Sequence, residues 1–173
     1  SGRSEIVVAS PYANRDHADF KDTIGWLNNV LVLHTQIDSD STVDGVVRAV
    51  RETCMSAYRG ADLPFAMLVD EYPEVREMQV AFGFQELPAK GVDLGGLQVE
   101  ILPLLGRRAA FDLEFRFLEA GDTVLAFLDY SSELFAEDVI ERIASDLVAL
   151  ATCADAKGDY PLRTLGLNVE GRV

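Results

Sequence analysis

The sequence predicts a single α/β (α+β) domain in which helices pack on a face of one mixed β-sheet. Short aliphatic runs at residues 5–9 and 30–33 are typical of buried strands. Residues 111–117 alternate apolar with charged side chains, as a half-buried strand does. Two further stretches, 43–58 and 139–150, repeat apolar residues at helical spacing and need a partner for their apolar faces. Because strands outnumber helices, one mixed sheet that carries the helices is the economical arrangement.

The first half of the chain carries clear boundary signals. Ser10-Pro11 is expected to end the first strand, and residues 14–21 form a polar loop that leads into a short helix. The aliphatic strand at 30–33 is expected to be covered on both faces. Residues 38–41 supply N-cap chemistry for the helix at 43–58, which Arg59-Gly60 ends. Asp62 as a cap and Pro64 in the first turn predict a shorter helix that stops at 72–73.

The second half is predicted to be mainly strands. Apolar residues at 80–84 indicate one strand, and the alternation of Leu97, Val99 and Ile101 indicates another. The strand from Phe111 is expected to turn at 121–122 into a hairpin partner at 123–130. From residue 157 onward the glycines and prolines indicate a linker or edge segment, so we expect a domain over 1–157 and a linker over 158–173.

Composition excludes several classes of partner. The 173 residues carry a net charge of −14, and the largest basic cluster is the pair Arg107-Arg108. Such an acidic surface repels phosphate backbones, so neither nucleic acid nor a membrane is expected as a partner. No apolar run approaches the roughly 20 residues that a membrane span needs, and no signal peptide is expected. Cys54 and Cys153 are expected to be reduced, buried residues, which indicates the cytoplasm.

The residues that could carry chemistry are few. His17 and His34 are the only histidines, and neither has a second ligand at metal-binding spacing, so no metal site is expected. The sequence contains no Gly-x-Ser-x-Gly nucleophile motif, and Gly91–Gly96 does not fit a dinucleotide fingerprint. Asp112 starts an apolar strand, where a structural salt bridge to a partner such as arginine is favoured over acid–base catalysis. By themselves the residues indicate an α/β domain without a complete catalytic constellation.

Six segments, in order, resemble the second half of condensation domains from nonribosomal peptide synthetases, and the resemblance covers essentially the whole chain. Residues 9–15 are similar to G-x-P-x-A-x-R, 24–34 to I-G-x-F-V-N-T-L-x-x-R, 62–65 to the core of H-Q-D-x-P-F-E, 110–113 to K-F-D-L, 128–135 to L-E-Y-x-x-x-L-F, and 160–162 to the exit toward the next domain.

The resemblance implies the C-terminal subdomain of a pair of chloramphenicol-acetyltransferase-like subdomains. The whole domain would join an acyl or peptidyl thioester to an amine, both held on phosphopantetheine arms of carrier domains. The expected partners are the N-terminal subdomain, peptidyl carrier domains and an adenylation domain, and this chain itself binds no cofactor. The family's catalytic H-H-x-x-x-D-G motif lies in the other half and is absent here, so we assign no catalytic residue and expect this half to provide tunnel wall and docking surface.

The same resemblance suggests candidate site residues. The motif positions Asn29, Asp62, Phe65, Phe111 and Asp112 are candidates for tunnel contacts or for structural roles, and Asn29 is also suited to bond backbone groups. Arg107 and Arg108 are candidates for contacting a phosphopantetheine phosphate, with a solvated loop pair as the alternative.

Two rival interpretations remain open from the sequence. The first is half of an epimerization domain or of a carrier-dependent acyltransferase, which share the fold. The second is a non-catalytic docking module. Departures from the family pattern favour it, because His34 replaces the motif's arginine, Gly60-Ala61 stands where His-Gln is usual, and Ala66 replaces glutamate.

Overall fold

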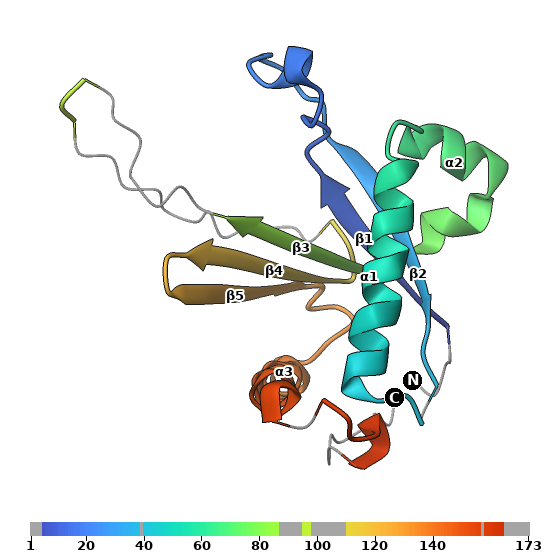
Figure 1. Cartoon of the computed structure of the whole chain (residues 1–173), viewed down its shortest axis with the longest axis vertical. Helices are drawn as coiled ribbons and strands as arrows, with labels where there is room; N and C mark the ends of the chain where they lie inside the picture. Colours follow the sequence, from blue (N-terminus) through green and yellow to red (C-terminus); the bar gives the residue numbers. More distant parts are fainter. Residues whose placement is uncertain (1–4, 39, 87–94, 98–109, 157, 165–173) are drawn as a thin grey trace.

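The structure, a computed structural model of the chain, describes residues 5–38, 40–86, 95–97, 110–156 and 158–164. In these residues five strands form one sheet in the order β2-β1-β3-β4-β5 (Figure 1). The strands are β1 (Glu5–Tyr12), β2 (Asn29–Gln36), β3 (Val80–Glu86), β4 (Leu113–Ala120) and β5 (Thr123–Tyr130). The outer pairs β1/β2 and β4/β5 are antiparallel, whereas β1/β3 and β3/β4 are parallel. The predicted mixed sheet with helices is confirmed.

Two small, fully buried residues pair at the centre of the sheet. Ala9 of β1 pairs with Ala81 of β3, and both are 0% exposed. Side chains alternate between the two faces of a strand. The neighbours of these alanines, Ser10 and Phe82, therefore point to the opposite face.

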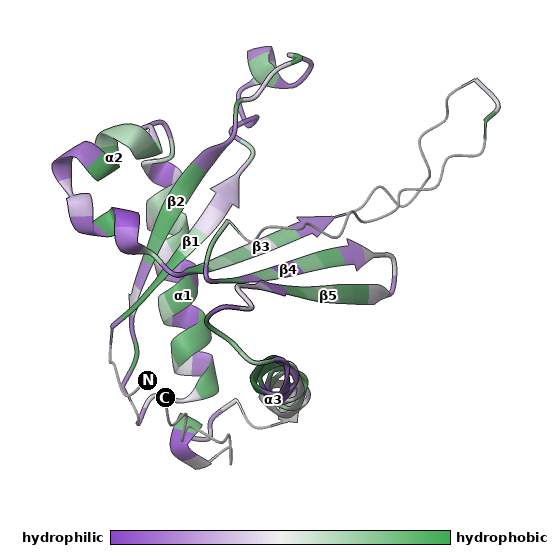
Figure 2. Cartoon of the chain, turned by 180° about the vertical axis from the view of Figure 1, so that it is seen from behind, coloured by the Kyte–Doolittle hydropathy of each residue, from purple (hydrophilic) through white to green (hydrophobic). Residues whose placement is uncertain are grey.

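Helix α1 (Val43–Arg59) covers that opposite face along β1 and β2 (Figure 1). The hydroxyls of Thr35 and Thr53 lie 3.2 Å apart, and the rings of Tyr12 and Tyr58 lie 5.7 Å apart. The helix shows hydrophilic and hydrophobic residues in alternating patches along its ribbon, as its amphipathic pattern predicts (Figure 2). We call this side of the sheet the α1 face and the other side the hollow face.

The remaining helices are α2 (Phe65–Glu71) and α3 (Glu137–Ala156), with 3-10 turns at η1 (Ala18–Phe20), η2 (Pro73–Glu77) and η3 (Leu162–Thr164). The caps differ from those that the sequence predicted. The N-cap of α1 is Thr42, whose side chain accepts a hydrogen bond from Gly45 N at 3.1 Å. The N-cap of α2 is Pro64, which has no side chain able to cap, while Asp62 lies exposed ahead of the helix.

Two expectations about strands were wrong. Leu31 is buried, but Val30 and Val32, which point to the face away from α1, are only half-buried, so the aliphatic run at 30–33 is not fully covered on both faces. Pro11 does not end β1, because it still pairs with Val30 of β2. The strand predicted around Leu97, Val99 and Ile101 lies almost wholly outside the described residues, and Leu97 itself is exposed.

The described part of the tail is attached to the start of α1. Pro161 forms a β-bridge with Thr42, and Leu162 N donates to Ser41 O at 2.9 Å. Asp44 N donates to Gly158 O at 3.0 Å. Residues 158–164 thus pack on the domain, where the sequence suggested a linker or edge segment.

Candidate functional site

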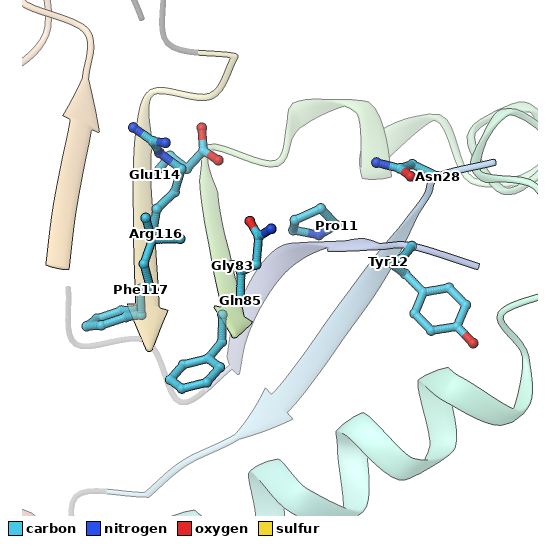
Figure 3. Close-up of a pocket in the computed structure, with 11 residues that line it drawn as sticks. Pro11, Tyr12, Asn28, Gly83, Gln85, Glu114, Arg116 and Phe117 are labelled. Carbon is cyan, nitrogen blue, oxygen red and sulfur yellow. The ribbon is translucent and has the colours of Figure 1, made fainter. Parts of the chain in front are cut away.

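An open hollow of about 440 Å³ lies where β1, β3 and β4 run toward their C-terminal ends (Figure 3). The hollow needs no other chain to form, because it lies between side chains of neighbouring strands and the segment just before β2. Its lining residues are Pro11, Tyr12, Ala13, Asn28, Gly83, Phe84, Gln85, Glu114, Arg116, Phe117 and Leu118.

The strand alternation divides polar from apolar lining residues. Glu114 and Arg116 point to the hollow face, whereas Phe117 points to the α1 face (Figure 3). On the α1 face the ring of Phe117 lies 5.3 Å from that of Phe82. The hollow face therefore offers an arginine, a glutamate and the amide of Gln85, a set that can hydrogen-bond a polar group. The described lining residues include no serine, cysteine or histidine.

Arg116 is held by two contacts on β5. Its Nε donates to Asp129 Oδ2 at 2.6 Å, and its guanidinium carbon lies 5.4 Å from the centre of the Phe127 ring. Phe127 is the direct cross-strand neighbour of Arg116, and Asp129 is its diagonal neighbour. Both charged side chains are mostly buried, with exposed fractions of 29% and 22%. Contacts with β5 therefore fix the position of Arg116, which is one of the residues that line the hollow.

Tyr12 carries a perturbed phenol at the margin of the hollow. Its hydroxyl donates to Asp16 Oδ2 at 2.5 Å. This hydrogen bond, helped by burial and by the negative charges of Asp16 and Asp62, raises the pKa of Tyr12 to about 12. The ring points toward α1 (Figure 3). Tyr12 thus acts as a donor to Asp16 and stays protonated at neutral pH.

Three of the candidate residues from the sequence, Asn29, Asp62 and Phe65, meet at one place. Asn29 Nδ2 donates to the carbonyls of Ala61 at 2.9 Å and Leu63 at 2.8 Å, and Asn29 Oδ1 accepts from Phe65 N at 2.9 Å. The side chain of Asn29 therefore bonds backbone groups and caps α2 from another part of the fold. This contact explains why α2 needs no cap from Asp62, which is exposed beside Phe65.

The other candidates lie elsewhere. Phe111 and Asp112 are half-buried and precede β4, and Asp112 O accepts from Ser131 N at 3.0 Å. Among the described residues no cation lies within ion-pair distance of the Asp112 carboxylate, and the ion pair of this hairpin is formed by Arg116 and Asp129 instead. Arg107 and Arg108 lie outside the described residues.

Sequence reasoning missed Arg116 and Asp129, although a signal was present. A hairpin turn at 121–122 fixes the register of its two strands, and this register places residue 116 opposite 127 and diagonal to 129. The alternation in the strand had already assigned Arg116 to the polar face. Combining both signals would have predicted the pair.

The histidines lie away from the hollow. His17 is exposed and caps η1, and exposed His34 Nε2 lies 4.0 Å from a carboxylate oxygen of Glu5. Within the described ranges, no three His, Cys, Asp or Glu side chains are grouped to hold a metal ion. Among those residues, no helix is long and apolar enough to span a bilayer.

Comparisons with known proteins agree on one family. The model of the Condensation domain family matches residues 1–171. Malpibaldin synthetase of Mortierella alpina is 31% identical over 173 residues, which cover 96% of this chain and 3% of that protein. Bacitracin synthase 3 of Bacillus licheniformis is 28% identical over 173 residues, which cover 96% of this chain and 3% of that protein.

Solved structures show the same fold. The first condensation domain of the calcium-dependent antibiotic synthetase, in complex with a substrate analogue, superposes with a TM-score of 0.79 at 17% identity and covers 96% of this chain and 39% of its own. The starter condensation domain of rhizomide synthetase gives a TM-score of 0.80 at 15% identity, with 96% and 40% covered. The chain thus spans about two fifths of these solved domains and a few per cent of the synthetases that it matches.

Proposed function

The chain belongs to the condensation-domain family, and from this premise we propose that it is the C-terminal half of a condensation domain that joins two carrier-bound substrates. In this reaction the nitrogen of an amine attacks the carbonyl carbon of a thioester. A C–N bond forms, the C–S bond breaks, and the proton lost by the amine ends on the thiol of the released carrier arm. Such a reaction depends on positioning and on stabilising the developing oxyanion.

The observation that carries the proposal is the hollow itself. It opens on a sheet face of polar character and is lined by Arg116, which is paired with Asp129, but its described lining includes no serine, cysteine or histidine. The sequence has no adjacent histidine pair, so a motif of the H-H-x-x-x-D-G kind has to come from the other half of the domain. This chain then supplies tunnel wall and docking surface.

The partners follow from the same proposal. They are the N-terminal half of the domain, carrier domains whose phosphopantetheine arms deliver both substrates, and an adjacent adenylation domain, all acting in the cytoplasm. Arg107 and Arg108 remain our candidates for contacting the phosphate of an arm. Asn29, Asp62 and Phe65 are proposed to shape the β2–α2 junction beside the tunnel, whereas Phe111 and Asp112 are proposed to fix the start of β4.

A condensation assay tests the proposal. One carrier is loaded with an acyl donor and a second with an amine acceptor, and amide formation is followed by mass spectrometry of the carriers. The chain alone, the N-terminal half alone, the two halves mixed and the complete single-chain domain are compared. Amide is expected only where the histidine motif and this chain are both present. Product from this chain alone, or no product from the complete domain, would contradict the proposal.

A docking module is the second candidate, and the departures from the family pattern at His34, Gly60-Ala61 and Ala66 favour it. It predicts that the complete domain binds a carrier but forms no amide with any loaded pair. Substituting the histidines of the other half separates the two candidates. If the complete domain forms amide and the substitution abolishes it, the chain belongs to an active condensation domain. If the complete domain binds a carrier without forming amide, and the substitution leaves this binding unchanged, the chain belongs to a docking module.

A further inference from the structure

The loop between β1 and β2 is built with its polar groups inside and its apolar groups outside. It runs from residue 13 to residue 28 and contains only the short turn η1. Connections of this length are uncommon in compact domains and are usually functional. In the part of the chain that the structure describes, its residues Ile24 and Trp26 are the most exposed large apolar side chains, at 102% and 87%.

Arg15 holds this loop together from within. Its guanidinium donates three hydrogen bonds to backbone carbonyls, to Phe20 O at 3.0 Å, to Thr23 O at 2.6 Å and to Gly25 O at 2.9 Å. The planar guanidinium group of Arg15 thereby binds carbonyl groups as far as ten residues away in the sequence. A guanidinium has five donors in fixed geometry, which a lysine ammonium cannot reproduce.

Smaller contacts support the same conformation. Thr23 Oγ1 donates to Asp19 O at 3.1 Å, and Gly25 adopts a positive φ of 157° that favours glycine. Ile24 and Trp26 lie on either side of this glycine, immediately after the carbonyl of Thr23 that Arg15 binds. The backbone that carries both apolar side chains is therefore fixed before any partner arrives, which lowers the entropy cost of binding.

We propose that Arg15 is a positioning residue that presents Ile24 and Trp26 as the anchor through which this chain binds the other half of its condensation domain. The partner surface is apolar, with a pocket for an indole. Exposed aromatic side chains on a preformed support are typical of the residues that dominate binding energy. The identity of the occupant rests on the proposed function.

The position of the loop supports this occupant. Tyr12, Ala13 and Asn28, where the loop leaves and rejoins the sheet, are lining residues of the hollow. The anchor thus stands beside the surface that the proposal assigns to the tunnel wall. The similar solved condensation domains are covered to only 39% and 40%, so most of such a domain remains to supply the partner surface.

The single tryptophan of the sequence allows a direct test. The chain is produced with 5-fluorotryptophan, so that Trp26 gives one ¹⁹F resonance, and the unlabelled other half is added. We expect the resonance to shift and to lose its sensitivity to H₂O/D₂O exchange as the indole becomes buried. An unchanged resonance while the halves associate would overturn the proposal, and so would a complete lack of association.

Variants separate anchoring from folding. Trp26→Ala leaves the hydrogen bonds of Arg15 intact and is expected to weaken association about tenfold or more, as at interface hot spots. Arg15→Ala and Arg15→Lys are expected to weaken it as well. Because the loop lies beyond the sheet, the sheet should stay folded, with the circular dichroism spectrum of the unaltered chain. Val148→Ala, at an equally apolar site that is 66% exposed on α3, is the matched control and should bind as the unaltered chain does.

The two proposals fail in different ways. If Trp26→Ala or Arg15→Ala binds as tightly as the unaltered chain, the anchor is excluded. Amide formation with an unmoved ¹⁹F resonance would reject the anchor and keep the condensation function. A shifted resonance in a complex that forms no amide would keep the anchor and reject the function.

Discussion

Asn29 and Phe65, 36 residues apart in the chain, are joined by a hydrogen bond of 2.9 Å from the backbone nitrogen of Phe65 to Asn29 Oδ1. The amide nitrogen of the same side chain donates to Ala61 O and Leu63 O. One carboxamide thus satisfies three backbone groups at the entry to α2, a helix whose N-cap, Pro64, offers none. Family motifs that are distant in sequence meet at this point.

Replacing Asn29 by alanine should destabilise the chain. The substitution removes three hydrogen bonds and leaves backbone groups of a half-buried junction unsatisfied, for which we expect a loss of about 2–3 kcal/mol in the free energy of unfolding. Urea denaturation followed by circular dichroism measures it. Asn28→Ala is the control, since Asn28 is exposed and should cost less than about 0.5 kcal/mol. An equal loss in the free energy of unfolding in both variants would show that the hydrogen bonds of Asn29 add no specific stability.

Tyr12 should titrate far above ordinary tyrosines. Its folded pKa of about 12 exceeds the unfolded value of 10.0, so its contribution to stability is fully present below about pH 10 and is lost as the pH rises toward 12. Spectrophotometric titration of tyrosinate should show one phenol titrating near pH 12 that disappears in Tyr12→Phe. The difference in stability between Tyr12→Phe and the unaltered chain should shrink between pH 10 and pH 12. A constant difference across this range would contradict the assignment.

Ending the chain at Ala156 should destabilise α1. The truncation removes the backbone hydrogen bonds Asp44 N to Gly158 O and Leu162 N to Ser41 O, which together contribute about 2 kcal/mol. Thermal unfolding would show the lower melting temperature. Arg163→Ala is the control, because its ion pair with Asp40 is exposed and is expected to contribute less than about 1 kcal/mol. An unaffected melting temperature in the truncated chain would restore the interpretation of this segment as a passive linker.

The isolated chain should bind apolar dyes and self-associate. Phe82 and Phe84 of β3 are 39% and 57% exposed on the α1 face, beyond the strands that α1 covers. An apolar surface of this kind marks an interface. Self-association in sedimentation velocity and dye fluorescence should both decrease in Phe84→Ser, and Val148→Ser on α3 serves as the comparison. A monomer that neither self-associates nor binds dye would contradict the expectation of an exposed apolar interface.

Local patterns predicted the elements well. The helix from Val43 to Arg59, the turn at Gly121 and the strand of alternating residues after Phe111 all follow from periodicity and turn chemistry, because these depend on neighbours within a few residues. The caps were predicted less well. Asp62 has the chemistry of a cap, but Asn29 reaches the same helix from a strand 36 residues away.

By itself, the sequence determined the family, the mixed sheet and the absence of a histidine pair, since each of these is written in local order and residue type. Only the tertiary structure decided that β2 lies at an edge, that Arg116 pairs with Asp129 in the wall of a hollow, and that Arg15 holds a loop with its tryptophan outside. These features join residues far apart in the chain. Their geometry depends on how strands and loops pack, which no window of neighbouring residues contains.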